Sequence, residues 1–224
     1  MERKPRQKRA VLEVAAVRNI RDAARAAGLM EWALIEWLYT NGARASEPGI
    51  ARLRDVNLTS GTVQLVHLKG GLAMEPMPLS KRLREALLAW LAVRPKGNDY
   101  VFPSANPRAC YPCRGKGEIL RKRREHVPTE VPCPHCHATG IRKGMTRFEV
   151  DRVVERVFAA AGIPPESRFP HILRHSAVTH MMDKGIAPTT IQDRVGHKAL
   201  ATTFGYMHTT QKARDEISRA FDED

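Results

Sequence analysis

Apolar residues in the first part of the chain recur every three or four positions, the spacing that places them on one face of a helix. This pattern predicts helices over residues 11–27 and 30–41, ended by Gly28 and by Asn41-Gly42. The buried face of the second helix is then formed by Trp32, Leu34, Ile35, Leu38 and Tyr39. We interpret this face as core packing and not as a cofactor site.

Two later stretches have the character of short strands. Residues 62–68 and 73–79 are joined by Lys69-Gly70-Gly71-Leu72, and glycine at such a position favours the tight turn of a β-hairpin. Pro76 and Pro78 place the second strand at the edge of its sheet, because proline has no N–H to donate to a neighbour.

Helical patterning returns after this hairpin. Ser80 can cap a helix over 81–93, with Pro95 just past its end. Pro48, directly after Glu47, suits the first turn of another helix. Further helices are predicted over residues 146–161, 172–183, 188–195 and 210–221. The fold class is therefore mainly α with a small antiparallel β-sheet, that is, α+β.

Residues 105–144, the cysteine segment, interrupt the helical pattern and have the composition of an insertion. The segment contains two C-x-x-C pairs separated by residues 114–132: Cys110 with Cys113, and Cys133 with Cys136. Two such pairs at this spacing indicate a Cys₄ zinc site, since four thiolates close a tetrahedral shell. With no open position, the Zn²⁺ would be structural. His135 and His137 are substitute ligands that the site does not need.

The formal net charge of +13 narrows the class of partner. Nucleic acid, an anionic membrane and an acidic protein are all compatible with it. The basic residues are spread over many segments and no amphipathic membrane helix stands out, so nucleic acid is favoured. The chain lacks an apolar run of about 18 residues, and its basic start lacks the apolar core of a signal peptide. We therefore expect a cytoplasmic protein.

Six polar residues scattered along the chain stand out by the short motifs around them. They are Arg44 in GARASE, Lys69 in the expected hairpin turn, His171 and Arg174 in PHILRHS, His197 in VGHKAL, and Tyr206 in TTFGYMH. Taken singly, each has an ordinary explanation, such as an arginine on the surface or a core tyrosine whose hydroxyl contacts water. The informative features are their order and the nine-residue step from His197 to Tyr206.

Together these motifs resemble the tyrosine recombinases of the phage-integrase type. That family carries an arginine in a G-x-R-x-S-E segment, a lysine in a β-hairpin, an H-x-x-R motif, a G-H motif, and a tyrosine nine residues beyond. The resemblance covers about residues 11–221, apart from the cysteine segment. Family members usually carry an N-terminal helical domain that clamps DNA, so this chain is expected to be a fragment or to depend on partners or substitutes.

The resemblance implies that a tyrosine attacks a DNA phosphodiester, leaving a 3′-phosphotyrosine bond and a free 5′-hydroxyl. Tyr206 would be the nucleophile. Arg44 and Arg174 would grip the non-bridging oxygens with planar, permanently charged groups. His171 and His197 would donate to the same oxygens or relay a proton, and His171 is the better acceptor for the tyrosine proton.

Supporting roles follow from the same resemblance. Lys69 would protonate the leaving 5′-oxygen, and Glu47 would orient the site by bonding Arg174 or His175. The phosphotyrosine stores the energy of the broken bond, so no ATP is needed. We expect no cofactor for catalysis, since the motifs require no metal and no loop looks like a P-loop.

The implied organisation is a basic arm over residues 1–10 and a catalytic domain over 11–224, interrupted by the cysteine segment at 105–144. The expected partner is double-stranded DNA in a bacterial, archaeal or viral host cell, with the protein nucleoid-associated when bound. A tetramer on DNA and accessory DNA-binding proteins are also expected, with the helix over 210–221 docking on a neighbouring protomer. The tip of the cysteine segment is expected to contact the phosphate backbone through Arg121, Lys122, Arg123 and Arg124.

Two other functions share these features. A type IB topoisomerase uses the same chemistry to relax DNA, although the HxLRHS and GH-x₈-Y patterns favour a recombinase. A non-catalytic, zinc-containing DNA-binding regulator derived from a recombinase would share the charge and the cysteines. The complete set of residues from Arg44 to Tyr206 argues against that second alternative.

Overall fold

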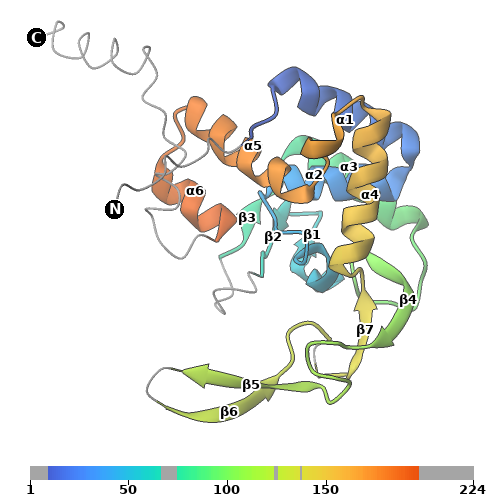
Figure 1. The fold of residues 1–224 in the computed structure, drawn as a ribbon, viewed down its shortest axis with the longest axis vertical. Helices are drawn as coiled ribbons and strands as arrows, with labels where there is room; N and C mark the ends of the chain where they lie inside the picture. The colour runs from blue at the N-terminus through green and yellow to red at the C-terminus, as the bar shows by residue number, and fades with distance from the viewer. Residues whose placement is uncertain (1–9, 67–74, 124–125, 137, 197–224) are drawn as a thin grey trace, which may run out of the picture.

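The computed structural model describes residues 10–66, 75–123, 126–136 and 138–196, and the structural statements below concern these residues. Within them, helices form the main body, as Figure 1 shows, and the strands form one three-stranded and two two-stranded antiparallel sheets. This confirms the α+β class. The helices are α1 (Val14–Ala27), α2 (Leu29–Thr40), α3 (Lys81–Val93), α4 (Arg147–Ala160), α5 (Pro170–Asp183) and α6 (Pro188–Val195).

Helix α2 is the centre of the body and packs against α1, α3, α4 and α5. Leu34, Ile35 and Leu38 are fully buried, while Trp32 and Tyr39 are partly buried at the edge of the same core. The expected core face is therefore confirmed. Because a helix that is buried on several sides needs apolar residues nearly all round, the α2 sequence LMEWALIEWLYT suits this central place.

Most predicted helix ends agree with the structure to within three residues. Gly28 separates α1 from α2 with a φ of 155°. The Ser80 hydroxyl accepts a hydrogen bond from the Leu83 N–H at 3.2 Å and caps α3. Pro48 begins only a three-residue 3₁₀ helix, Pro48–Ile50, and not an α-helix. No described helix is long and apolar enough to cross a membrane.

A three-stranded antiparallel sheet lies beside the helices in the order β1 (Val56–Asn57), β2 (Thr62–Val63) and β3 (Met77–Pro78). Strand β2 pairs with β3 in the register Thr62 with Pro78 and Val63 with Met77. The antiparallel pairing and the edge position of the second strand are confirmed, but in the described residues each strand has only two residues and is shorter than predicted. Strand β1 was not predicted.

The cysteine segment forms two further antiparallel pairs. Strands β4 (Pro103–Ala109) and β7 (Ile141–Gly144) make a stem, and β5 (Glu118–Arg123) and β6 (His126–Pro132) make an outer hairpin. Figure 1 shows this hairpin projecting away from the helical body. The expected arm over residues 1–9, the Lys69–Leu72 turn, Arg124, His137 and the helix over 210–221 lie outside the described residues.

Candidate active site and metal centre

The loop after α2 positions Arg44. The Arg44 N–H donates to Glu47 Oε2 at 2.7 Å, and its Nη1 donates to Glu47 Oε1 at 2.8 Å. Both oxygens of the Glu47 carboxylate thus bind Arg44, three residues earlier, a partner that we had not predicted. The Arg44 side chain is 20% exposed and that of Glu47 only 6%. This pair holds one guanidinium at the surface in a fixed orientation.

Helix α5 positions the H-x-x-R residues. Pro170 occupies its first turn, where a missing N–H costs nothing, and this explains why the helix begins before the predicted residue 172. Arg174 is 1% exposed and donates to Gly42 O at 2.5 Å and to Val195 O at 2.8 Å. A buried charge is tolerated only when its donors are satisfied, so these bonds fix the guanidinium.

The end of α6 binds both arginines. Arg44 Nη2 donates to Gly196 O at 3.0 Å, and Arg174 donates to the carbonyl of the preceding residue, Val195. Gly196 ends the helix in the left-handed region with φ 65° and ψ 48°, a conformation that glycine adopts without strain. His197 is the next residue in the chain, and its own position lies outside the described residues.

Gly42 allows the end of α2 to approach α6. Its φ is +54°, and a Cβ there would lie 2.7 Å from Val195 Cγ1. The glycine therefore satisfies two requirements at once, a left-handed backbone and a close contact. Its carbonyl is also the one that accepts from Arg174.

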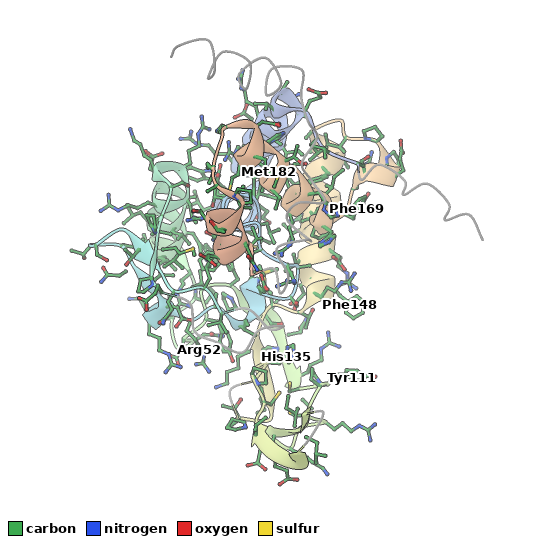
Figure 2. The ribbon with its side chains drawn as sticks, turned by 90° about the vertical axis from the view of Figure 1, so that its left-hand side faces the viewer. Arg52, Tyr111, His135, Phe148, Phe169 and Met182 are labelled. Atoms are coloured by element: carbon green, nitrogen blue, oxygen red, sulfur yellow. The ribbon has the colours of Figure 1, made fainter. Side chains whose placement is uncertain are left out.

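A groove of about 440 Å³ brings Arg44 and His171 together. Its other lining residues include Ser46, Arg147, Asp151, Arg168 and Phe169. Figure 2 labels Phe169 and Phe148 on the face of the molecule that carries this region. Burial holds the pKa of the Asp151 carboxyl above its ordinary value. The Arg147 guanidinium, 3.5 Å away, opposes this effect but does not outweigh it. Arginines outnumber carboxylates in the lining, so the groove suits an anion.

His171 and His175 lie one helical turn apart on α5. Their ring centroids are 4.4 Å apart with an interplanar angle of 74°. His171 is exposed in the groove, whereas His175 is half-buried behind it. The structure thus gathers Arg44, Glu47, His171, Arg174 and His175. Lys69, His197 and Tyr206 lie outside the described residues.

Arg194 is a residue of this region that no sequence motif singles out. Its Nε donates to Thr40 O at 3.0 Å, one Nη to Asn41 Oδ1 at 3.0 Å, and both Nη to Pro78 O at 3.2 Å. One side chain therefore ties α6 to the end of α2 and to strand β3. Arg194 lies three positions before His197. Its partners Thr40, Asn41 and Pro78 are so distant in the chain that no local motif could have indicated them.

The four cysteines of the cysteine segment meet in one buried cluster. Cys110 Sγ lies 3.8 Å from Cys133 Sγ, and Cys113 Sγ lies 3.6 Å from Cys136 Sγ. All four sulfurs are within 4.8 Å of one another and could hold a metal ion. A tetrahedral shell with metal–sulfur bonds of about 2.3 Å has sulfur–sulfur edges of about 3.8 Å. The arrangement fits such a shell.

The two C-x-x-C turns have matching backbone bonds. The Cys110 N–H donates to Gly140 O, and the Cys133 N–H donates to Gly117 O, both at 2.7 Å. A Cβ on Gly117 would lie 2.3 Å from Ala138 O, and one on Gly140 would lie 2.2 Å from Gly115 O. The residues after each C-x-x-C pair thus pack closely against those after the other pair. This close approach explains the glycines in the two following segments, RGKG and HATG.

The electrostatics of the thiols differ. Burial, together with the neighbouring thiols, raises the pKa of Cys110. Burial also acts to raise the pKa of Cys113, but the Gly117 N–H, 3.3 Å from its sulfur, and bonds from the other cysteines bring that pKa to about 7. An N–H that donates to sulfur favours the thiolate, which is the form that binds metals.

The fold is shared with solved recombinases. The XerA recombinase matches with a TM-score of 0.67 at 20% identity, covering 98% of this chain and 65% of that one. The XerH site-specific recombinase, solved in a pre-cleavage complex with its difH substrate, matches with a TM-score of 0.65 at 20% identity and covers 95% of this chain and 55% of that one.

The chain belongs to the phage integrase family, whose family model matches residues 10–213. It is 29% identical over 180 residues to tyrosine recombinase XerC of Erythrobacter litoralis, covering 79% of this chain and 45% of that protein. It is 31% identical over 185 residues to an integrase/recombinase of Escherichia coli, covering 76% and 52%. These matches confirm the resemblance to tyrosine recombinases. The chain spans about half the length of the curated relatives it matches.

Proposed function

We propose that this chain is the catalytic part of a site-specific DNA recombinase that cleaves and rejoins DNA through a 3′-phosphotyrosine intermediate. The observation that carries the proposal is the arrangement of Arg44, His171 and Arg174. Arg44 and His171 line one groove, and both arginines bind consecutive carbonyls at the end of α6. The chain's relatives bear the names of tyrosine recombinases, which agrees with this activity.

The arginines would act on the phosphate. In the transition state, negative charge builds up on the two non-bridging oxygens, and donors that are already in place stabilise it without reorganisation. Arg44 is held by Glu47 and Gly196, and Arg174 by Gly42 and Val195, so neither must find its orientation when DNA binds. His171, exposed in the same groove, would donate to these oxygens or accept the tyrosine proton.

The remaining chemistry is assigned to residues outside the described part of the chain. Tyr206 would attack phosphorus and form the phosphotyrosine bond, while the 5′-oxygen leaves and takes a proton from Lys69. His197 would add a donor to the phosphate. Its expected place is supported by Gly196, the preceding residue, whose carbonyl already binds Arg44. His175, behind His171 on α5, would hold that ring in place.

Double-stranded DNA is the proposed substrate. The net charge of +13 provides attraction to the phosphate backbone over the whole surface. The outer hairpin of β5 and β6 would extend this contact through the arginines and lysine of its tip, Arg121, Lys122, Arg123 and Arg124. We further propose that the protein acts in the cytoplasm as a tetramer on DNA, with the helix over residues 210–221 docking on a neighbouring protomer.

The metal of the cysteine cluster is proposed to be structural Zn²⁺. The donor set supports this choice, since four thiolates at tetrahedral spacing are typical of zinc and leave no position open for a substrate. The ion would stabilise a segment in whose described residues the cysteines form the buried apolar cluster, with Ile119 packed against it. We propose that residues 11–224 form one catalytic domain interrupted by this segment.

The function is tested by comparing two reactions on the same preparation. A plasmid carrying two copies of a site selected from random duplexes reports recombination, and a supercoiled plasmid lacking the site reports relaxation. Site-dependent recombination that is absent in Tyr206→Phe is the expected result. Relaxation without strand exchange would favour a topoisomerase, and site-specific binding without either reaction would favour a regulator.

A further inference from the structure

The base of the cysteine segment contacts both walls of the groove that contains Arg44 and His171. At this base the incoming strand β4 and the outgoing strand β7 pair, with Pro103 opposite Gly144. Figure 1 shows β4 and β7 between the outer hairpin of β5 and β6 and the helical body. The contacts of the base reach the Arg44 loop on one side and the first turn of α4 on the other.

On the first side, Gly144 lies against the 3₁₀ helix Pro48–Ile50. A Cβ on Gly144 would lie 2.1 Å from Gly49 O, so no larger residue fits without a backbone shift. Gly49 is two residues after Glu47, the residue that holds Arg44 by its carboxylate. The short helix and the Arg44 turn therefore form one continuous unit, and Gly144 sets how far that unit can move.

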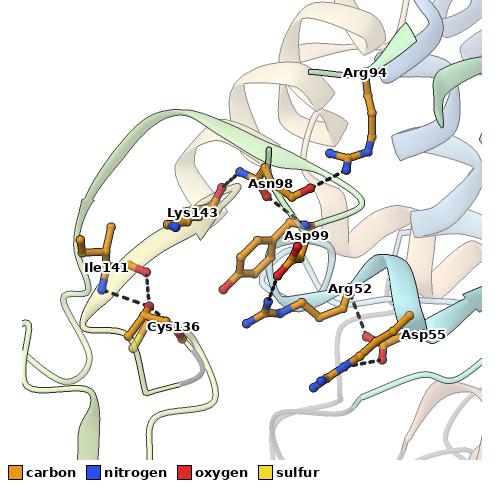
Figure 3. Close-up of polar contacts among 11 residues, drawn as sticks. Arg52, Asp55, Arg94, Asn98, Asp99, Cys136, Ile141 and Lys143 are labelled. Carbon is orange, nitrogen blue, oxygen red and sulfur yellow. Dashed lines mark hydrogen bonds and ion pairs between the residues drawn. The ribbon is translucent and has the colours of Figure 1, made fainter. Parts of the chain in front are cut away.

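Residues 99–101, which lead directly into β4, hold the same unit from its far end. The Leu53 N–H donates to Asp99 O at 2.7 Å, and the Val101 N–H donates to Ala51 O at 2.9 Å. Figure 3 shows Arg52 reaching Asp99, at an Nη1–Oδ2 distance of 3.1 Å. Residues 49–53 are thus held by Gly144 of β7 on one side and by residues 99–101, just before β4, on the other.

On the second side, Glu149 in the first turn of α4 binds the start of β4. Its Oε1 accepts from Ser104 Oγ at 2.8 Å and from the Ala105 N–H at 3.3 Å, while its Oε2 accepts from the Thr146 N–H at 2.7 Å. The same turn of α4 carries Arg147, which lines the groove. The base of the cysteine segment therefore bridges the two walls.

We infer that the cysteine segment, beyond any contact with DNA, is a positioning element for the groove. Gly144 acts through Gly49 on the Arg44 turn, and Glu149 connects the same strands to α4. A metal at the cysteines, at the far end of the β4–β7 stem, would stiffen this bridge. The effect on cleavage rests on the proposed function, whereas the effect on the Arg44 turn does not depend on it.

Hydrogen exchange of the full chain tests the connection directly. The amides of Glu47, Ile50 and Ala51 are bonded within the Arg44 turn and its short helix, to Arg44 O, Glu47 O and Pro48 O. Removing zinc with a chelator should speed their exchange by about tenfold or more, while amides of α1 and α2 keep their rates. Faster exchange confined to residues 105–144 would overturn the proposal.

A substitution that leaves the cysteines intact provides the second test. Gly144→Ala should speed exchange at the same amides and lower single-turnover DNA cleavage by about tenfold or more, with zinc content retained and DNA affinity within about threefold. The matched control is Gly97→Ala, where a new Cβ meets open space although φ is +80°. This control should cleave like the wild type.

The outcomes separate the two proposals. If Gly144→Ala changes neither exchange nor cleavage, or changes exchange without changing cleavage, the segment does not position the groove. If the wild-type protein itself fails to cleave DNA, the proposed function fails, but the exchange of the Glu47, Ile50 and Ala51 amides still decides whether the segment controls the Arg44 turn.

Discussion

Arg44 and Arg174 donate to the carbonyls of consecutive residues, Gly196 at 3.0 Å and Val195 at 2.8 Å. Two consecutive peptide units at the end of α6 therefore set the separation of two guanidinium groups that come from distant parts of the chain. The second of these units joins Gly196 to His197. The end of α6 thus binds Arg44 and Arg174 and is followed directly by His197. All three residues are proposed to bind the scissile phosphate.

Replacing Arg174 by lysine should impair cleavage far more than DNA binding. A lysine keeps the charge but lacks the planar fork that binds Gly42 O and Val195 O together. We expect single-turnover cleavage to fall by about 10²–10³, the usual effect of losing one preorganised donor. The dissociation constant should change by less than about threefold, because the lost interaction is strongest in the transition state.

The control for this variant is Arg156→Lys on α4, where the arginine is 62% exposed and pairs with Glu31 away from the groove lining. It should cleave at the wild-type rate. Equal losses of affinity and rate in Arg174→Lys would mean that Arg174 makes an ordinary phosphate contact.

Gly42→Ala should destabilise the protein by more than its left-handed backbone alone explains. The backbone cost of alanine at positive φ is about 1 kcal/mol, and a Cβ 2.7 Å from Val195 Cγ1 adds strain on top of it. We expect a total loss of about 2–3 kcal/mol in the free energy of unfolding. Gly162→Ala, at φ +73° with no atom within 4 Å of the new Cβ, isolates the backbone term. Similar losses in both variants, measured by urea denaturation, would exclude a special packing role for Gly42.

Metal analysis of protein purified without chelators should find one zinc per chain. Cys133→Ser should lose it, because three thiolates no longer close the shell. Tyr111→Ser, in the other C-x-x-C turn, changes a side chain that is 90% exposed and should leave the zinc content unchanged. Purified wild-type protein without zinc would contradict the assignment of Cys110, Cys113, Cys133 and Cys136 as ligands.

The stability contributed by Glu149 should depend on pH. Burial acts to raise its pKa, but hydrogen bonds from Thr146, Ser104 and Ala105 outweigh it and hold the pKa below the ordinary value of 4.5. Because the folded state favours the ionised form, this stabilisation is complete above the ordinary pKa and is lost as the pH falls through the lowered one.

The difference in unfolding free energy between wild type and Glu149→Gln should therefore shrink as the pH is lowered from about 6 to about 3. The exposed Glu166→Gln variant serves as the control and should follow the wild type at every pH. A difference that is constant over this range would show that Glu149 acts by its shape and not by its charge.

The sequence predicts the helices well because their apolar spacing and their end signals are local. Ser80 and Gly28 act on their own helices, and the glycines of the expected turn correctly indicate a hairpin, although β2 covers only Thr62–Val63. Strand β1, with only two residues, carries no periodicity to detect. The 3₁₀ helix at Pro48 is shorter than a helix signal suggests, because Gly49 follows and its carbonyl is packed against Gly144.

The site was predicted less completely, and the reason is again distance along the chain. The residue types of Arg44, His171 and Arg174 follow from motifs. The partners of the two arginines at Val195 and Gly196 are backbone carbonyls, which have no sequence signature. Arg194 depends on Thr40 and Pro78, which come near it only in the folded chain. Glu47 binds the arginine three residues before it, a local pair that the spacing alone could have indicated.

The most direct test of the account is to trap the covalent complex and map its bond. A nicked suicide duplex carrying the selected site should form a covalent adduct with the wild-type chain, and mass spectrometry of the digested adduct should find the phosphodiester on the peptide that contains Tyr206. Tyr206→Phe should still bind the duplex but form no adduct. An adduct that persists in Tyr206→Phe, or a linkage mapped to another residue, would contradict the proposed mechanism.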